Sequence, residues 1–440
     1  MSLSTQPYRG ARDFYPEDKR IQKYLFSVMR KTVEGFGYQE YDAPVVEPLE
    51  LYAAKTSEEI VNSQTYSFTD RGGRNVTLRP EMTPTVARMV AARRQGLAYP
   101  LRWYSIPNIW RYERPQAGRL REHWQLNVDL FGLAGLEGDH EIIWIADTIM
   151  QAYGAKRETY ETRISSRLLL KWLLSEYLRL EQSQIGFLIH LLDKKDKLSA
   201  KEFSKLVEEN LTTSQRQTDL LQRLLALTKV KRIIELPLET QQHPAVAQLD
   251  KLITLLDDSG IKNVRFDLGL VRGFDYYTDV VFEVYDTHPS NNRSMFGGGR
   301  YDNLLSEFGV EAVPTVGFGM GDVTLLNFLT VHKLLPDLQS ETDATVILVG
   351  DLYKESRKIV KLLRDEGLRL AVDGSPKKLG DKLKQAAKSK VPFVIIIGPQ
   401  ELDSDRYRLK NLQTGEEKML SAERIVATVS PRHRAFGESE

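Results

Sequence analysis

Four arginines surround a short turn between residues 111 and 121. The stretch RYERPQAGRLREHWQLNVDL places Arg111, Arg114, Arg119 and Arg121 around a Pro-Gln-Ala-Gly turn, and a strand-like run follows. A planar guanidinium group can bind two phosphate oxygens at once, which the point charge of lysine cannot do. The spacing therefore predicts a hairpin that presents fixed positive charge to an anionic ligand.

The strand after this turn separates polar from apolar side chains. Alternation places an apolar set on one face of the strand, namely Trp124, Leu126, Val128 and Leu130. The other face carries a polar set, namely Arg121, His123, Gln125, Asn127 and Asp129. The apolar set must face a core. Arg111 and Glu113 share one parity on the incoming strand and can line the same face as the polar set. A solvated sheet face is the alternative for this strand alone, but the joint pattern favours an anionic ligand on the open face of an antiparallel sheet.

Length and composition exclude several classes of protein. The chain has 440 residues, which implies more than one domain, and 41% apolar with 28% charged residues indicates a globular protein. A net charge of +1 means that any nucleic-acid binding must come from local patches. The absence of cysteine excludes disulfides, thiolate metal sites and a cysteine nucleophile, and no HxxH pair predicts a zinc site. We expect a cytoplasmic protein, because neither a signal core nor a run of ~18 apolar residues is present.

The first 330 residues alternate between helical and hairpin patterns. Residues 18–36 have helical spacing, YDAPVVEP predicts a strand interrupted by Pro44 and Pro48, and hairpins are expected at 64–81 and 101–131. A Leu- and Lys-rich helical segment follows at about 166–256, and strands resume at NVRFDLGL and DVVFEVYD. Gly297, Gly298 and Gly299 are expected to form a turn. This pattern favours an α+β domain with an antiparallel sheet flanked by helices.

The polar segment 334–343 is a candidate linker, so we expect one domain over 1–333 and another over 342–430. Beyond the linker the pattern runs strand, helix, strand, helix, strand, which predicts a small parallel or mixed α/β domain. Its helix at 378–389 should have an apolar stripe formed by Leu379, Leu383 and Ala386. Its outer basic face should be formed by Lys378, Lys382, Lys384 and Lys388. The basic face could be merely solvated or could attract RNA.

Several motifs spread over nearly the whole chain resemble those of the histidyl-tRNA synthetases, a family of class II aminoacyl-tRNA synthetases. They are RGARDFYPED, TLRPEMT, RYERPQAGRLRE, LVRGFDYYTDVVFEV and GGGRYDNLL, together with the C-terminal α/β segment, which resembles an anticodon-binding domain. The resemblance implies a ligase of protein biosynthesis. It would activate histidine with ATP to histidyl-adenylate and transfer the acyl group to the 3′ end of histidine tRNA.

The resemblance also implies a nucleotide site. Arg111 would contact the α-phosphate of ATP, Glu113 the adenine edge, and Arg119 and Arg121 the β- and γ-phosphates, with Mg²⁺ bound through these phosphates. His123, Gly319 and Gly321 are expected at the same site. At the turn, Arg114 and Gln116 would meet the acceptor end of the tRNA, and a solvated hairpin tip is the alternative for Arg114.

Histidine needs an anchor for its α-ammonium group and acceptors for its imidazole. By the same resemblance Glu81 and Thr83 hold the ammonium group, while Gln125 and Asp129 supply acceptors. An acidic acceptor suits imidazole because few other side chains present an N–H donor there. Tyr276, Tyr277 and Tyr301 would close the pocket, and the alternative for these tyrosines is a place in the core.

Arg272 is the strongest catalytic candidate. It ends an apolar run and precedes Gly273, which allows a close backbone approach to a ligand. In the family this arginine stands where other class II enzymes use a metal ion, and it would stabilise charge as histidine attacks the α-phosphorus. An ion pair with Asp267 or Asp275 is the structural alternative.

Two departures from the family pattern fall on the nucleotide site. His123 stands where a phenylalanine normally stacks on adenine, and Val323 and Thr324 stand where the family has Glu-Arg. A histidine can still stack, whereas a threonine cannot replace a guanidinium group. We hypothesise that another basic residue, Arg71 or Arg74, compensates.

The N-terminal helix and the strand with Pro44 resemble the motif that builds the class II dimer interface, so we expect a homodimer. Two other functions remain open. One is a noncatalytic histidine-binding paralogue that regulates ATP phosphoribosyltransferase, which normally lacks the C-terminal domain. The other is a tRNA-binding or signalling module without turnover.

Overall fold

The protein is described by a computed structural model that covers residues 3–53, 64–116, 118–193, 198–211, 223, 226–227, 230–270, 276–291 and 293–429. The chain divides into two compact units, Met1–Leu335 and Pro336–Glu440. The division falls inside the polar segment 334–343. None of the helices in these ranges combines the length and apolar character needed to cross a membrane.

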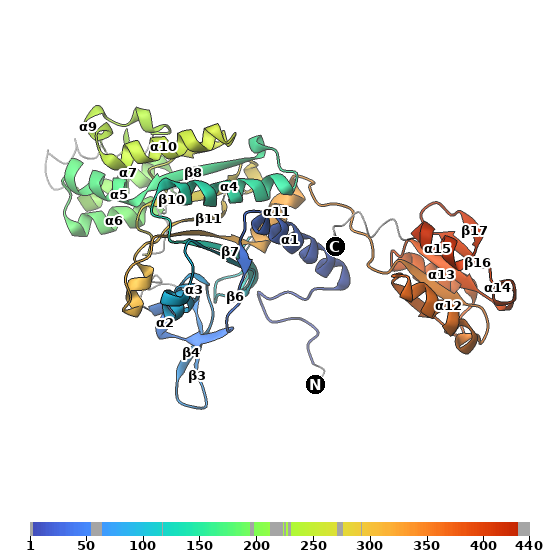
Figure 1. The fold of residues 1–440 in the computed structure, drawn as a ribbon. Coiled ribbons are helices and arrows are strands. Elements are labelled where there is room, and N and C mark those ends of the chain that lie inside the picture. The colour runs from blue at the N-terminus through green and yellow to red at the C-terminus, as the bar shows by residue number, and fades with distance from the viewer. Residues whose placement is uncertain are drawn as a thin grey trace. The chain divides into compact units, whose positions relative to one another are not determined.

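The first unit is built on a nine-stranded sheet with the order β1-β5-β7-β12-β11-β10-β8-β9, and β6 pairs with β7 (Figure 1). All pairs are antiparallel except β1 with β5 and β8 with β9. The expected antiparallel sheet is thus confirmed, with one parallel pair at each edge. The strands are β1 (Gln39–Glu40), β5 (Leu101–Ser105), β6 (Asn108–Trp110), β7 (Glu122–Phe131), β8 (Tyr160–Ser166), β9 (Val264–Phe266), β10 (Val280–Asp286), β11 (Ser294–Arg300) and β12 (Thr315–Gly321).

Helices α1 (Pro16–Gly35), α4 (Leu136–Ala152) and α11 (Asp322–Val331) pack on one face of this sheet (Figure 1). The predicted N-terminal helix is confirmed. Pro16 suits its first turn because a proline needs no hydrogen-bond acceptor there. The apolar residues Leu126, Val128 and Leu130 of β7 share one buried cluster with isoleucines of α4, so the predicted parity of this strand is confirmed as well.

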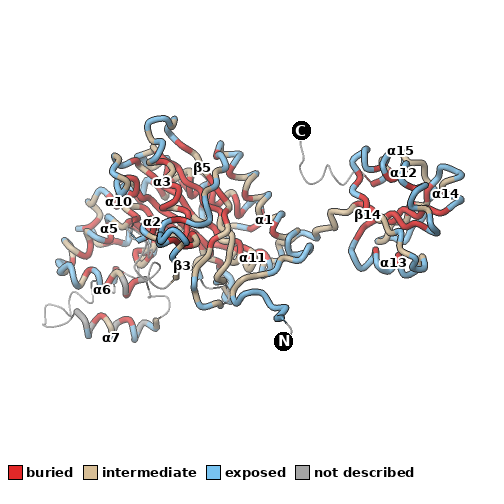
Figure 2. The backbone as a smooth tube through the Cα atoms, turned by 90° about the horizontal axis from the view of Figure 1, so that it is seen from below, coloured by how far each residue is buried: buried red, intermediate tan, exposed pale blue. Residues whose placement is uncertain are grey.

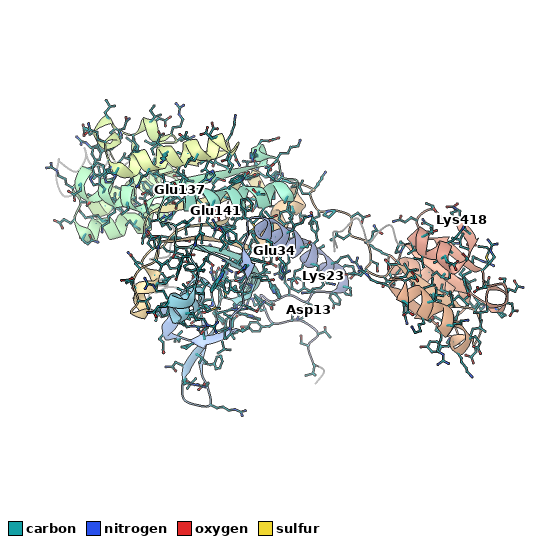
Figure 3. The ribbon with its side chains drawn as sticks, viewed as in Figure 1. Asp13, Lys23, Glu34, Glu137, Glu141 and Lys418 are labelled. Carbon is teal, nitrogen blue, oxygen red and sulfur yellow. The ribbon has the colours of Figure 1, made fainter. Side chains whose placement is uncertain are left out.

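Carboxylates on the two helices also reach the sheet. Glu34 of α1 accepts a hydrogen bond of 2.6 Å from the Tyr104 hydroxyl, and Glu141 of α4 accepts from Tyr38 and Arg102 (Figure 3). These bonds fix the helix layer to strand β5 and its surroundings.

The hairpin expected at 64–81 forms a separate small sheet with the order β2-β4-β3. Its strands are β2 (Val46–Pro48), β3 (Tyr66–Thr69) and β4 (Asn75–Leu78), and α2 (Glu50–Ala53), α3 (Thr83–Arg93) and the 3₁₀ turn η2 (Arg94–Gly96) lie beside it in the chain. The strand expected over YDAPVVEP is limited to Val46–Pro48, because Pro44 has no N–H to donate to a ladder.

The predicted helical segment is confirmed in the described residues. It contains α5 (Arg167–Trp172), the π-helical turn η4 (Leu173–Tyr177), α6 (Gln182–Asp193), α7 (Ala200–Leu211), η6 (Ile233–Glu235), α9 (Leu238–Gln241) and α10 (Pro244–Asp258). Three further 3₁₀ turns lie beside strands: η3 (Arg157–Thr159) joins α4 to β8, η7 (Pro289–Asn291) joins β10 to β11, and η8 (Leu304–Phe308) joins β11 to β12.

The turn expected at Gly297, Gly298 and Gly299 is wrong, because all three glycines lie inside strand β11. A Cβ on Gly298 would overlap the carbonyl oxygen of Gly317, and one on Gly299 would lie 2.5 Å from the carbonyl oxygen of Val280. The glycines therefore serve close packing within the sheet rather than a change of chain direction.

The second unit is a five-stranded mixed sheet with the order β14-β13-β15-β16-β17. Its helices lie around the buried part of the backbone (Figure 2). β13, β14 and β15 are parallel, as predicted, whereas β16 and β17 add an antiparallel hairpin that the sequence did not indicate. The elements are β13 (Ala344–Leu348), α12 (Tyr353–Asp365), β14 (Leu370–Asp373), α13 (Leu379–Lys388), β15 (Phe393–Ile397), α14 (Pro399–Ser404), β16 (Tyr407–Asn411), β17 (Glu417–Leu420) and α15 (Ala422–Val429).

The basic face predicted for α13 needs one correction. Lys382 is 3% exposed, and its ammonium group donates to the carbonyl oxygens of Leu348 and Asp373 at 2.8 and 3.3 Å. The long aliphatic stem packs inside while the ammonium group reaches these two main-chain acceptors at the ends of β13 and β14. Lys378, Lys384 and Lys388 are exposed as expected.

Candidate active site

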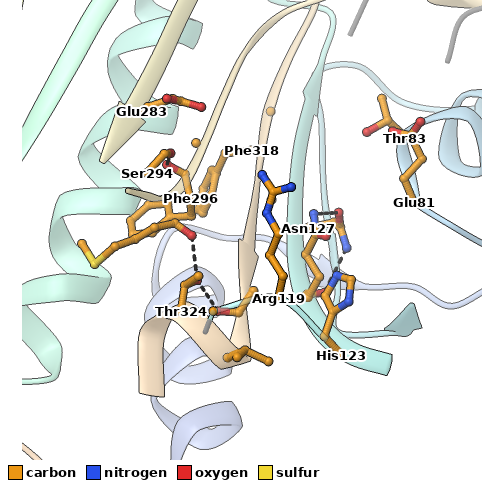
Figure 4. Close-up of a pocket in the computed structure, with 18 of the residues that line it drawn as sticks. Glu81, Thr83, Arg119, His123, Asn127, Glu283, Ser294, Phe296, Phe318 and Thr324 are labelled. Atoms are coloured by element: carbon orange, nitrogen blue, oxygen red, sulfur yellow. Dashed lines mark hydrogen bonds between the residues drawn. The ribbon is translucent and has the colours of Figure 1, made fainter. Parts of the chain in front are cut away.

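A cavity of about 390 Å³ lies on the open face of the nine-stranded sheet. Figure 4 shows residues from opposite sides of this cavity, namely Glu81 and Thr83 on one side, Glu283, Ser294 and Phe296 on the other, and Arg119, Asn127 and His123 between them. Its lining combines strands β7, β10, β11 and β12 with the arginine hairpin.

Glycines form the floor of the cavity. Gly297 of β11 pairs with Gly319 of β12, and Gly319 pairs with Asn127 of β7. A Cβ on Gly317 would lie 2.5 Å from the Tyr301 hydroxyl and 2.7 Å from Asp129. The hollow thus exists because two neighbouring central strands carry no side chains where the flanking strands carry polar ones.

The polar face of β7 forms one wall. His123, Gln125, Asn127 and Asp129 all line the cavity, as the alternation predicted. The amide groups of Gln125 and Asn127 hold each other, since Gln125 Nε2 donates to Asn127 Oδ1 at 3.1 Å. Burial and the positive charge of Arg111 lower the pKa of His123 to about 3, so its imidazole is neutral and can present a flat face.

Asp129 lies at the closed end of the cavity and is 3% exposed. Burial raises its pKa to about 7, and the neighbouring Tyr301 and Tyr41 hydroxyl groups act in the opposite direction. The Tyr301 hydroxyl donates to Oδ1, whereas neither Oδ2 nor the buried Tyr41 hydroxyl completes a hydrogen bond within the described residues. A buried carboxylate oxygen without a donor is costly, so this oxygen is well suited to a donor on a ligand.

Three tyrosines surround the same end. Tyr276, Tyr277 and Tyr301 are 2–7% exposed, their ring centroids lie 4.9 to 6.2 Å apart, and all three line the cavity. Tyr276 donates to Glu81 at 3.2 Å. From the sequence, a place in the pocket and a place in the core were alternatives for these tyrosines. Both hold, because the three rings belong to a buried cluster and also border the cavity.

The arginines of the hairpin have different positions. Arg111 lines the cavity and donates from Nε to the carbonyl oxygen of Pro80 at 2.8 Å, and Arg119 lines it and lies 3.3 Å from Glu113. Arg121 is absent from the lining residues, and its guanidinium group instead contacts Tyr112 and Tyr8. Arg114 and Gln116 are exposed and also lie outside the lining, at the turn itself.

Comparisons with known proteins agree with these motifs. A family model for histidyl-tRNA synthetase matches residues 10–323, and a model for an anticodon binding domain matches residues 343–432. The chain belongs to the histidyl-tRNA synthetase family. A histidine--tRNA ligase of Leptospira biflexa is 43% identical over 412 residues, which cover 93% of this chain and 94% of that protein. One of Thermococcus kodakarensis is 36% identical over 96% of this chain and 97% of that protein.

Solved structures show the same fold. A histidyl-tRNA synthetase from Nostoc sp. PCC 7120 superposes with a TM-score of 0.82 at 22% identity, covering 98% of this chain and all of that chain. An apo histidyl-tRNA synthetase from S. aureus gives a TM-score of 0.71 at 25% identity, covering 97% and 100%. The described fold is therefore that of histidyl-tRNA synthetases in both units of the chain.

The departures from the family pattern lie together in the cavity. Val323 and Thr324 both line it, and the Thr324 hydroxyl donates to the carbonyl oxygen of Met295 at 2.7 Å (Figure 4). A Cβ on Gly118 would lie 3.6 Å from Thr324 Cγ2, so the hairpin approaches the small threonine side chain closely. Neither Arg71 nor Arg74 lines the cavity, and Arg74 pairs with Asp70 at 2.7 Å.

The opposite wall contains residues that the sequence analysis did not identify as part of the site. Glu283 and Tyr285 of β10 line the cavity, and the Tyr285 hydroxyl donates to Glu283 at 2.6 Å. Arg163 of β8 lies 3.9 Å from the Tyr285 ring, and pairs with Glu161 and Asp267. The two-residue spacing of Glu283 and Tyr285 in DVVFEVYD could have placed both on one face of a strand, but it does not reveal which cavity that face borders.

Arg272, with Gly273 and Asp275, lies outside the described residues, so its predicted role stays a prediction. Among the described residues no group of three or more histidines, aspartates and glutamates is placed to hold a metal ion.

Proposed function

We propose that the protein activates histidine with ATP and transfers the histidyl group to the 3′ end of histidine tRNA. The observation that carries this proposal is the buried Asp129 carboxyl above the glycine floor, whose Oδ2 has no partner among the described residues. An imidazole N–H supplies the missing donor, and a substrate without such a donor leaves the oxygen unsatisfied. Glu81 and Thr83 then hold the α-ammonium group.

The nucleotide occupies the end of the cavity formed by the arginine hairpin. Arg111 and Arg119 contact phosphates, Glu113 reads the adenine edge, and the neutral His123 ring stacks on the base. Arg119 lines the cavity and follows Gly118, which lies near Thr324, whereas Arg71 and Arg74 do not line it; this makes Arg119 the better substitute for the missing family arginine. Magnesium, bound through the phosphates, would neutralise part of their charge.

No side chain acts as a nucleophile, because the histidine carboxylate attacks the α-phosphorus in line with the leaving pyrophosphate. The residues of this chain therefore contribute alignment and fixed charge. We assign the charge stabilisation at the α-phosphate to Arg272 and Arg111.

The tRNA contacts the anticodon-binding domain and the hairpin turn, at Arg114 and Gln116. We propose a cytoplasmic homodimer. Its interface would include β2, which pairs on one side only, because Val46 of this strand and the preceding Val45 are 43% and 44% exposed.

Histidine-dependent ATP–pyrophosphate exchange, followed by charging of histidine tRNA, tests this function. We expect both reactions. Exchange without charging would indicate an adenylate-forming paralogue, and the absence of both would indicate a binding protein, such as the regulatory paralogue of ATP phosphoribosyltransferase. Histidine binding alone would not support the proposal.

A further inference from the structure

Three tyrosines surround the Arg121 guanidinium group outside the cavity. Its central carbon lies 4.0 Å from the Tyr112 ring centroid and 5.5 Å from that of Tyr8, and Nη1 donates to the Tyr8 hydroxyl at 2.8 Å. The Tyr66 ring lies 5.2 Å from Tyr112 and 6.3 Å from Tyr8. We call Tyr8, Tyr66, Tyr112 and Arg121 the tyrosine cage.

The cage comes from three segments that main-chain hydrogen bonds hold together. The Arg121 N–H donates to the carbonyl oxygen of Gly10 at 2.9 Å, and the Arg111 N–H donates to that of Arg121 at 2.8 Å. Gly10 has a φ of +89°, and a Cβ there would lie 2.8 Å from the Arg121 side chain, so only a glycine permits this approach. The Tyr112 N–H donates to Gln64, two residues before Tyr66. The rings are therefore held in place before any ligand arrives.

The positive charge of the cage is not neutralised by a carboxylate within the described residues. Arg121 Nε donates to the carbonyl oxygen of Glu113, and its other contacts are the tyrosines. Arg119, by contrast, pairs with the Glu113 carboxylate. Tyr8 and Tyr112 are 51% and 49% exposed, so an uncompensated cation lies between two large, half-exposed aromatic faces.

This combination fits single-stranded nucleic acid. Aromatic faces accept unstacked bases, a guanidinium group adds stacking and a bidentate phosphate contact, and base-paired regions cannot offer their faces in this way. The position of the cage beside the cavity favours the end of a nucleic-acid strand over its interior. Tyr112 lies between Arg111 and Glu113, which both line the cavity, so a strand on the cage is next to the place of the reaction.

We propose that the tyrosine cage binds the unpaired 3′ nucleotides of the tRNA as they approach the cavity. The inference rests on the proposed aminoacylation and adds to it a binding site of its own, separate from the hairpin tip. The cage acts on tRNA and contributes nothing to adenylate formation.

The test combines a kinetic comparison with a binding cycle. Tyr112→Ala and Tyr8→Ala should each raise the KM for tRNA in charging by about 5- to 10-fold, in line with the value of one base–aromatic stack. Tyr112→Phe and Tyr8→Phe should retain most of the affinity. The KM values for ATP and histidine in pyrophosphate exchange should not change, and Tyr15→Ala, another exposed tyrosine outside the cage, should affect neither reaction.

In the binding cycle, the affinity of full-length protein is measured for an acceptor-stem RNA with and without its unpaired 3′ nucleotides. Tyr112→Ala should weaken only the RNA that has them. Equal weakening for both RNAs, no weakening at all, or a raised KM for ATP would each overturn the proposal. A wild-type protein that neither exchanges nor charges would refute the aminoacylation function instead, and the binding cycle would still decide on the cage.

Discussion

The two ends of the cavity differ in how completely they are built before a ligand binds. At the end with Asp129, the carboxylates and tyrosines are buried and hold one another, as with Tyr301 on Asp129 and Tyr276 on Glu81. At the hairpin end the charged side chains are more accessible, and the Arg119 side chain is 54% exposed.

This difference indicates where selectivity lies. A buried acceptor penalises any ligand that leaves it unpaired, whereas exposed ion pairs are weak because water and salt compete with them. We therefore expect the amino-acid end to determine which substrate is accepted. The nucleotide end should tolerate changes, as the threonine at position 324 indicates.

The largest effect should come from filling the glycine floor. In Gly317→Ala the new Cβ would lie 2.5 Å from the carbonyl oxygen of Val128, which cannot move aside, and 2.7 Å from Asp129. Exchange activity should fall by about 100-fold or more, because small displacements of reacting groups are that costly. In Gly319→Ala the clash is with the flexible Gln125 amide, so a smaller loss is expected. Equal losses would show that the depth of the floor does not matter.

A second change removes the charge at the buried end. Asp129→Asn keeps the shape but replaces a carboxylate acceptor, and should raise the KM for histidine by about 10- to 100-fold, the range for a hydrogen bond to a charged group. The KM for ATP should change little. Tyr301→Phe, which removes only the donor to Oδ1, should have the smaller effect. If Asp129→Asn raised the KM for ATP as much as the KM for histidine, the contrast between the two ends of the cavity would be refuted.

The same carboxyl predicts a dependence on pH. Its pKa is about 7 in the folded protein against an ordinary 3.8, so folding takes up a proton between these values. Compared with Asp129→Asn, the wild type should lose stability as pH rises from about 4 to about 7 and remain level above that. The ionised form is the better acceptor for imidazole, so the KM for histidine should rise more steeply below about pH 7 in the wild type than in Asp129→Asn, where only the substrate's own imidazole titrates. Melting temperatures and exchange kinetics of both proteins over this range measure the effect, and parallel curves would contradict it.

Much of this site could be predicted from local sequence. The alternation in EHWQLNVDL predicted which side chains of β7 face the cavity, and strand and helix patterns predicted most of the C-terminal unit. Both rest on periodicities of one segment, which need no knowledge of its neighbours.

What the sequence did not reveal depends on pairing between distant segments. Glu283 borders the cavity because β10 pairs with β11, β11 with β12, and β12 with β7, more than 150 residues earlier in the chain. The glycines of β11 resembled a turn because only the neighbouring carbonyl oxygens explain why a side chain is excluded there. Lys382 of helix α13 resembled a surface residue because its hydrogen-bond acceptors, the carbonyl oxygens of Leu348 and Asp373, lie on strands β13 and β14.

The smallest expected effect concerns which arginine near the nucleotide end of the cavity contacts ATP. Arg119→Gln should raise the KM for ATP by about 5- to 10-fold, the scale of one charge-assisted contact that is partly screened by water. Arg71→Gln and Arg74→Gln, at the tip of the β3–β4 hairpin, should leave it unchanged, since neither residue lines the cavity. Exchange kinetics of the three variants at equal ionic strength make the comparison. If Arg71→Gln or Arg74→Gln weakened ATP binding as much as Arg119→Gln, the β3–β4 hairpin would have to reach the nucleotide and replace the missing family arginine. If only Arg119→Gln did so, the arginine hairpin would provide the replacement for the missing family arginine.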